Sequence, residues 1–187
     1  MSRRNIKPEV LWCANHRNIR GNGRNGWSFP REVDSKIQEI CTGQTVVHFF
    51  GGLAKFGMRL DIDPIVKPDI IGDAWLPPFA GASFDVVVLD PPYLSFCREV
   101  LFSLLHGAAF VARKRVVWLG HIWAPSGFGC QLEQSWLVRC GDSLVVRALQ
   151  VFRRTDKPMT PIKYFSRGPQ MKYNRWLQQP EQLPFGD

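Results

Sequence analysis

Short apolar runs recur along the chain, separated by polar segments and by segments that contain Gly or Pro. Most are nearly continuous in Val, Ile, Leu and Phe and lack strict alternation, which is typical of strands buried on both faces. We expect a strand in each of seven ranges: 45–50, 58–63, 69–73, 84–90, 115–123, 135–140 and 144–152.

Two segments have helical character. Residues 31–41 follow Pro30 and place Val33 and Ile37 on one face, as expected of a helix that Pro opens. A second, more apolar stretch spans roughly 96–112. Buried strands mixed with helices predict an α/β sheet covered on both faces.

The two ends of the chain have a different character from its middle. The first 26 residues are rich in Arg, Asn and Gly and have no apolar period, so we expect a loop or arm. Beyond about residue 155 the chain is rich in Pro, basic and aromatic residues. These patterns divide it into a basic arm (1–26), one domain (27–153) and a basic aromatic extension (154–187).

Composition narrows the class of protein. The chain has 187 residues, of which 45% are hydrophobic and 21% charged, and these values exclude extensive disorder. No run approaches the ~18 apolar residues of a membrane span, and the N-terminus lacks the apolar core of a signal peptide. Five scattered cysteines favour a reducing compartment over a disulfide framework. We therefore expect a cytoplasmic protein without a membrane partner.

The net charge of +8 is concentrated at the ends. Residues 1–31 hold seven Lys and Arg against one acid, and residues 153–187 hold seven against three, whereas 32–152 hold ten against twelve. A nearly neutral body with two basic ends suggests a polyanionic partner such as nucleic acid. Basic tails that serve solubility alone are the alternative.

The sharpest local feature is the end of the apolar run 86–89, which is followed by Asp90-Pro91-Pro92-Tyr93. Ligands of open α/β sheets bind where strands end in this way. Two consecutive prolines make the backbone rigid and leave it only carbonyl acceptors.

A carboxylate beside rigid carbonyls suits an amine that donates two hydrogens. Tyr93 adds a flat face on which a base can stack, an interaction worth roughly 1–3 kcal/mol. Together these groups would hold an exocyclic amine and leave its lone pair free to attack. A plain turn after a core strand, with an incidental aromatic residue, is the alternative.

With these residues the chain resembles the S-adenosylmethionine-dependent amino-methyltransferases of nucleic acids. Asp90, Pro91, Pro92 and Tyr93 match all four positions of that family's catalytic motif. The resemblance spans roughly residues 27–153 and implies a class I methyltransferase domain: a mostly parallel, seven-stranded sheet with a reversed C-terminal hairpin. The last two runs would form this hairpin. The resemblance also implies a flipped-out target base.

The resemblance extends to weaker motifs that bind the cofactor, S-adenosylmethionine, in the family. Phe50 begins the glycine-containing loop, Asp61 would hold the ribose hydroxyls with Asp63 as its rival, and Asp73 would accept from the adenine amino group. The matching residues are Trp27, Ser28, Phe29, Pro30, Phe50, Gly51, Gly52, Asp61, Asp63, Asp73 and Ala74.

One departure from the family concerns the first crossover. Only eight residues (53–60) separate Gly52 from Asp61. A crossover between parallel strands ordinarily takes a dozen or more residues, including its helix. We therefore expect the first crossover helix to be shortened or absent, with Gly57 helping the chain to reverse.

Basic and aromatic residues outside these motifs are candidates for nucleic-acid contacts. Arginines of the arm suit phosphates, and the extension interleaves cations with aromatic rings. Trp123 follows the fifth run and could form a second wall for the base. The candidates are Arg17, Arg20, Arg24, Trp123, Lys163, Arg167, Lys172 and Arg175. No metal site is expected, because Cys13 and His16 lack a second pair of ligands.

These observations predict an enzyme that methylates an exocyclic amine of a DNA base, adenine N6 in preference to cytosine N4. RNA as the substrate is an alternative, since the charge fits structured RNA equally well. A nucleic-acid-binding protein that lost the cofactor is another, favoured by the short crossover. We expect no large recognition domain, so specificity would be short or supplied by a homodimer or a partner subunit.

Overall fold

The computed structural model describes residues 9–13, 29–91, 98–120, 126–140 and 146–155. Its strands are β1 (Glu9–Cys13), β2 (Val46–Phe49), β3 (Met58–Asp61), β4 (Ile70–Ile71), β5 (Phe84–Leu89), β6 (Ala112–Gly120), β7 (Cys130–Cys140) and β8 (Val146–Arg154). Its helices are α1 (Arg31–Cys41), a short 3-10 helix (Pro64–Val66) and α2 (Arg98–Val111). All seven predicted strands and both predicted helices are present, with bounds shifted by a few residues.

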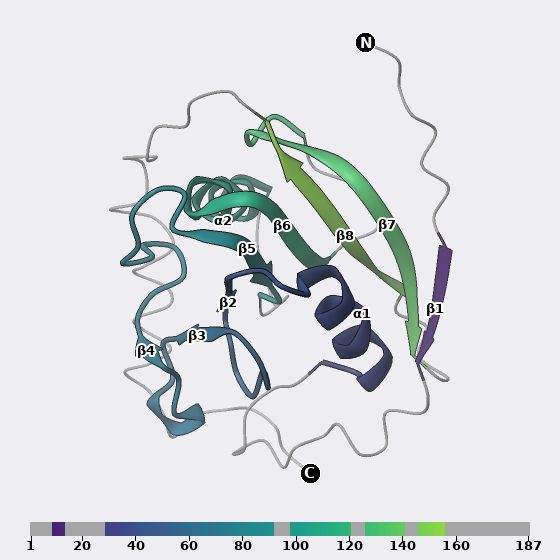
Figure 1. Cartoon of the computed structure of the whole chain (residues 1–187), viewed down its shortest axis with the longest axis horizontal. Helices are drawn as coiled ribbons and strands as arrows, with labels where there is room; N and C mark the ends of the chain where they lie inside the picture. The colour runs from purple at the N-terminus through teal and green to yellow at the C-terminus, as the bar shows by residue number, and fades with distance from the viewer. Residues whose placement is uncertain (1–8, 14–28, 92–97, 121–125, 141–145, 156–187) are drawn as a thin grey trace.

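The eight strands form one sheet in the order β1-β7-β8-β6-β5-β2-β3-β4 (Figure 1). Strand β8 is antiparallel to both β6 and β7, and all other neighbours are parallel. The mostly parallel sheet with a reversed C-terminal hairpin is thus confirmed.

The expectation of seven strands and of a loop over residues 1–26 is corrected by β1, which adds an eighth strand at the edge. It pairs in parallel with β7, from Glu9 opposite Trp136 to Cys13 opposite Cys140. The Trp136 indole also donates to the Glu9 carboxylate (3.1 Å). Five residues flanked by polar sequence carry too little periodicity to indicate a strand, and its partner lies more than 120 residues away.

The core is divided by the sheet into two layers, because successive strand residues point to opposite faces. Val87 and Leu89 of β5 pack in the cluster that includes α2, whereas Val86 and Val88 pack in the cluster that includes Val33 of α1. One helix therefore covers each face of the central strands. Among the described residues, no helix is long and apolar enough to cross a membrane.

The connection from β2 to β3 contains no helix, which confirms the short first crossover. Phe50, Gly52 and Gly57 all have positive φ (60°, 44° and 70°), so the chain reverses within residues 50–57. The aromatic ring of Phe56 packs edge-on against His48 of β2, with 4.8 Å between ring centroids. A bulky loop residue thus covers the strand where a crossover helix would otherwise pack.

His48 is almost fully buried (1% exposed) under this loop. Burial lowers the pKa of His48 from 6.5 to about 4, and a hydrogen bond with the Phe56 backbone offsets only part of that effect. The imidazole is therefore neutral in the folded protein near pH 7.

Asp85 stabilises the amino edge of the sheet, where the parallel strands begin. Its carboxylate accepts from the Thr45 backbone N–H (3.1 Å) and hydroxyl (3.0 Å), and it forms ion pairs with Arg113 (3.1 Å) and Lys114 (3.2 Å). The hydrogen bond from the Thr45 N–H, followed by those from Lys114 and the Thr45 hydroxyl, lowers the pKa of Asp85 to about 2. The start of β5 is thereby tied to the chain entering β2 and to the start of β6.

Gly57→Ala should destabilise the fold. A Cβ at Gly57 would lie 3.0 Å from the Cβ and the carbonyl oxygen of Val46, at a φ of +70°. Left-handed backbone and overpacking each cost about 1–2 kcal/mol for a residue with a side chain, so we expect the free energy of unfolding in urea to fall by about 2–3 kcal/mol. Gly107→Ala in α2 is the matched control, because a Cβ there meets nothing within 4 Å. It should raise stability by about 0.5–1 kcal/mol.

His48 should make stability depend on pH. The unfolded chain binds a proton near pH 6.5 and the folded one only near pH 4. Because His48 must lose its proton to fold, the free energy of unfolding is unaffected by this group above pH 6.5. It falls by up to about 3 kcal/mol as the pH drops towards 4. Urea unfolding of His48→Gln over this range should show a flatter dependence. An unchanged slope would contradict this role for His48.

Candidate functional site at the carboxyl edge

The strands β2, β3, β4 and β5 are parallel, so their carboxyl ends meet at one edge of the sheet. After β2 the chain runs outwards through β3 and β4 and then returns to β5 on the other side of β2. This reversal of strand order is the place where open α/β sheets bind ligands.

A hollow opens at this edge and spans about 190 Å³, part of it open to solvent. Since that space includes open solvent, the hollow is a shallow depression with essentially no enclosed room, and a ligand would lie across it rather than inside it. The residues that line it are Phe50, Asp61, Ile62, Gly72, Asp73, Ala74 and Trp75.

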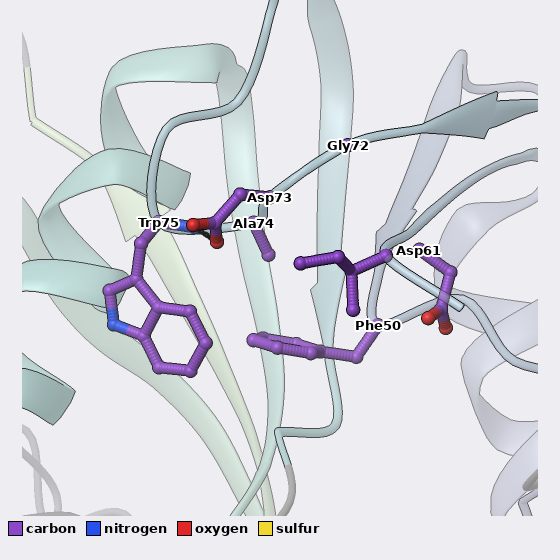
Figure 2. Close-up of a pocket in the computed structure, with 7 residues that line it drawn as sticks. Phe50, Asp61, Gly72, Asp73, Ala74 and Trp75 are labelled. Atoms are coloured by element: carbon purple, nitrogen blue, oxygen red, sulfur yellow. Dashed lines mark hydrogen bonds between the residues drawn. The ribbon is translucent and has the colours of Figure 1, made fainter. Parts of the chain in front are cut away.

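Aromatic rings form one wall of the hollow. The rings of Phe50 and Trp75 meet edge to face, with centroids 5.1 Å apart and planes at 78°. Figure 2 shows the Phe50 ring between Trp75 and Asp61, with Asp73 and Ala74 beside them. The hollow thus combines a flat apolar surface with a carboxylate on either side of it, which suits a planar ligand that carries hydroxyl and amino donors.

Asp61 ends β3 and organises the chain around the hollow. Its Oδ2 accepts from the Gly52 N–H (2.9 Å) and its Oδ1 from the Asp63 N–H (3.0 Å). A carboxylate has about four acceptor positions, and hydrogen bonds from the described residues occupy two of them. The side chain is therefore held in place by the two loops it joins while keeping capacity for ligand hydroxyls.

Asp63, the rival candidate, has a different environment. Its carboxylate accepts from the Ile65 N–H (2.9 Å) and caps the 3-10 helix, as Asp residues commonly do. It does not line the hollow. The structure thus favours Asp61 for contact with a ligand there.

Arg59 holds the segment after β3 in place. Its guanidinium donates to the carbonyls of Gly52 (3.4 Å), Val66 (3.3 Å) and Lys67 (2.6 Å). Its backbone N–H donates to Asp69 (2.8 Å), and this bond contributes most to lowering the pKa of that carboxyl. One side chain therefore supports both loops beside the hollow.

Asp73 closes the other side of the hollow. Its Oδ1 accepts from the Trp75 N–H (2.9 Å), and its backbone carbonyl accepts from the Leu76 N–H (3.0 Å). No hydrogen bond within the described residues engages its Oδ2. The turn thus fixes Trp75 against Phe50 and leaves a carboxylate oxygen for a donor.

Asp90 and Pro91 lie at the end of β5, next to the hollow. Phe49 and Leu89 are paired in register, so Phe50 and Asp90 follow equivalent positions of neighbouring strands. The Asp90 side chain is only 3% exposed, and Arg147 Nη1 lies 4.0 Å from its Oδ1. Arg147 belongs to β8, whose antiparallel direction brings its first residues to this edge.

The structure brings Phe50, Asp61, Asp73 and Ala74 of the predicted cofactor set together in the hollow. Gly51 and Gly52 lie beside it: the Gly51 N–H donates to the Leu60 carbonyl (2.9 Å), and a Cβ on Gly51 would come within 2.7 Å of Arg59. Phe29 packs against the core on the α1 side and Pro30 precedes α1, so neither lines the hollow.

The other candidates lie outside the described residues and remain predictions. They are Trp27, Ser28, Pro92, Tyr93, Arg17, Arg20, Arg24, Trp123, Lys163, Arg167, Lys172 and Arg175.

Sequence analysis did not select Ile62 or Arg147, whereas Gly72 and Trp75 belong to the same four-residue motif as Asp73 and Ala74. Ile62 directly follows Asp61, so extending that motif by one position would have found it. Arg147 carries no local signal, because its proximity to Asp90 depends on the position of β8 in the sheet.

No protein-family model matches the sequence, and no curated protein is detectably similar to it. Solved structures do match its fold. The magnesium protoporphyrin IX methyltransferase of Synechocystis PCC 6803, with bound S-adenosylmethionine, is 9% identical, with a TM-score of 0.51 over 66% of this chain and 76% of that one. The chain has the class I methyltransferase fold.

Two further class I structures support the same conclusion about the fold. The 1,6-didemethyltoxoflavin-N1-methyltransferase of Burkholderia thailandensis, with S-adenosylhomocysteine, is 10% identical, with a TM-score of 0.54 over 67% of this chain and 78% of that one. The N-methyltransferase NodS of Bradyrhizobium japonicum WM9 is 9% identical, with a TM-score of 0.52 over 67% and 96%. At such identities the likeness concerns the fold alone.

Proposed function

We propose that this protein is a methyltransferase that transfers a methyl group from S-adenosylmethionine to the exocyclic amine of a DNA base. Adenine N6 is the preferred acceptor, ahead of cytosine N4. The observation that carries the proposal is the juxtaposition at the switch point of the sheet. There the hollow, with Asp61 and Asp73 in its lining, lies next to Asp90 and Pro91. These two residues are the first half of the Asp-Pro-Pro-Tyr motif.

The lining of the hollow fits the adenosine part of the cofactor. The free acceptor positions of Asp61 suit the two ribose hydroxyls, and Oδ2 of Asp73 suits the adenine amino group. The ring of Phe50 and the small side chain of Ala74 supply apolar surface for the adenine plane. When bound, the cofactor supplies an electrophilic methyl group. The class I fold and its solved relatives support methyl transfer as the reaction.

The amine would bind at the end of β5. The Asp90 carboxylate and the Pro91 carbonyl accept its two hydrogens, Pro92 keeps the turn rigid, and Tyr93 stacks on the base. These bonds would draw the nitrogen lone pair out of conjugation with the ring and make it available to an electrophilic methyl group. The bond from the methyl group to sulfur would break as its bond to nitrogen forms, with S-adenosylhomocysteine as the other product. The nitrogen would then lose a proton, which requires no strong base because the proton leaves after the attack.

RNA is the second candidate substrate. The basic charge of the two ends, seven Lys and Arg against one acid and seven against three, suits the phosphates of either polymer. Transfer of a labelled methyl group to DNA and to RNA of the same sequence separates the two. The DNA proposal predicts labelling of DNA, and labelling of RNA alone would replace it with the RNA candidate.

Asp61→Ala should weaken the affinity for S-adenosylmethionine in calorimetric titration by at least tenfold. It removes a charged acceptor from the ribose and also frees the Gly52 loop, and each charged hydrogen bond is worth roughly 1.5–3 kcal/mol. Asp63→Ala is the matched control: it removes a carboxylate two residues away that caps the 3-10 helix and does not line the hollow. Equal losses in both variants would argue against this ribose site.

Tyr93→Ala should lower methyl transfer by about 10- to 100-fold while leaving the affinity for the cofactor unchanged, because the stacking concerns the base alone. Tyr93→Phe should keep most of the activity. The assigned roles are wrong if Tyr93→Ala abolishes cofactor binding while Asp61→Ala leaves it intact.

A further inference from the structure

The additional strand β1 carries an exposed aromatic surface. Val10 and Trp12 point to one face, and they are 47% and 63% exposed, whereas Leu11 and Cys13 point to the core on the other face. So large an exposed fraction is uncommon for Trp, which usually buries most of its ring. Exposed apolar groups that are clustered rather than scattered mark sites of interaction.

A cation accompanies this ring. Trp12 pairs in register with Arg139 of β7, and the guanidinium carbon of Arg139 lies 5.1 Å from the centroid of the Trp12 ring. Arg139 is itself exposed. Val10, Trp12 and Arg139 are referred to below as the β1 patch. The acidic residue of β1, Glu9, lies on the opposite face, where its carboxylate accepts from Trp136.

The β1 patch lies at the same edge of the sheet as the candidate active site. Strands β1 and β7 run parallel to β6 and β5, so Trp12 and Arg139 are near the carboxyl edge at which Asp90 is located. Three strands lie between β1 and β5. At ~4.8 Å per strand, the patch and Asp90 are roughly 19 Å apart across the sheet. Figure 1 shows β1 at the outer edge, beside β7.

A second arginine lies between the two places. Arg147 is among the first residues of β8, which is next to β7, and its guanidinium lies 4.0 Å from Asp90. Arg147 pairs with the buried Val138 and therefore points to the face opposite Trp12 and Arg139, so only the carboxyl edge of the sheet connects the two places. Within the β1 patch, an aromatic ring and a cation lie together. Such a combination is typical of surfaces that follow a nucleic-acid strand, with bases stacked on aromatic rings and cations beside phosphates.

We propose that the β1 patch binds an unpaired stretch of the substrate strand beside the target nucleotide, with one base stacked on Trp12 and a phosphate held by Arg139. The proposal rests on the proposed function and specifies how its substrate is bound. Only an unpaired base offers a free face to Trp12, since the bases of a duplex are already stacked on each other. Single-stranded or locally opened nucleic acid is therefore the preferred substrate.

The test is fluorescence anisotropy with a fluorescein-labelled 16-nucleotide DNA strand that contains adenines, alone and as a duplex, at several salt concentrations. The wild-type protein should bind the single strand more tightly. Trp12→Ala should weaken that binding by about tenfold, the contribution of one stacked base, and Trp12→Phe should retain most of it. Arg139→Gln should lower the slope of log Kd against log salt by about one.

Two matched controls should leave binding unchanged. Ile65→Ala removes another highly exposed apolar side chain (69% exposed) on the 3-10 helix. Arg153→Gln removes the same charge as Arg139→Gln. Arg153 is exposed and lies in the last part of β8, near the amino edge of the sheet and away from the β1 patch. In methyl-transfer assays, Trp12→Ala should raise KM for the single strand while kcat and the calorimetric affinity for S-adenosylmethionine stay the same.

The outcomes separate this inference from the function on which it rests. If the wild-type protein methylates DNA and Trp12→Ala behaves like Ile65→Ala, the β1 patch is not a strand-binding surface, although the proposed function stands. A change from dimer to monomer in Trp12→Ala, seen by light scattering, would overturn the inference in favour of a second copy on the patch. A wild-type protein that binds and methylates neither DNA nor RNA would overturn both proposals.

Discussion

The carboxylate of Asp61 links the two loops on which the geometry of the candidate site depends. One oxygen holds the Gly52 loop after β2, and the other holds the chain as it leaves β3. Charged acceptors form stronger hydrogen bonds to backbone N–H groups than neutral ones do, which suits loops that no crossover helix supports. Phe50 and Ile62, on either side of these bonds, line the hollow next to Asp61 itself.

The short connections change how this class I sheet is stabilised. Side chains stabilise the loops that have no crossover helix beside them. Phe56 covers His48, and Arg59 donates hydrogen bonds to carbonyls of the loops around β3. Burying a neutral histidine and fixing a long arginine both oppose folding through desolvation and lost side-chain entropy. The apolar core lies on both faces of β5, between α1 and α2.

The direction of the strands explains why so many functional candidates meet. Parallel strands end at one edge, and the reversal of order between β2 and β5 places Phe50 and Asp90 side by side. The reversed strand β8 begins at that edge and brings Arg147 to Asp90, whereas β1 extends the edge outwards with Trp12. Distant parts of the chain thereby meet at one edge of the sheet.

Local patterns in the sequence determined seven of the eight strands, both helices and the absent crossover helix, because apolar runs, a helix-opening proline and an eight-residue spacing are short-range constraints. Motif resemblance also selected Phe50, Asp61 and Asp73, which the structure brings together around one hollow. Only the tertiary structure distinguished Asp61 from Asp63, because Asp61 lines the hollow whereas Asp63 caps the 3-10 helix. It alone revealed β1 and the Arg147–Asp90 pair, since these contacts join residues 127 and 57 positions apart that no local periodicity relates.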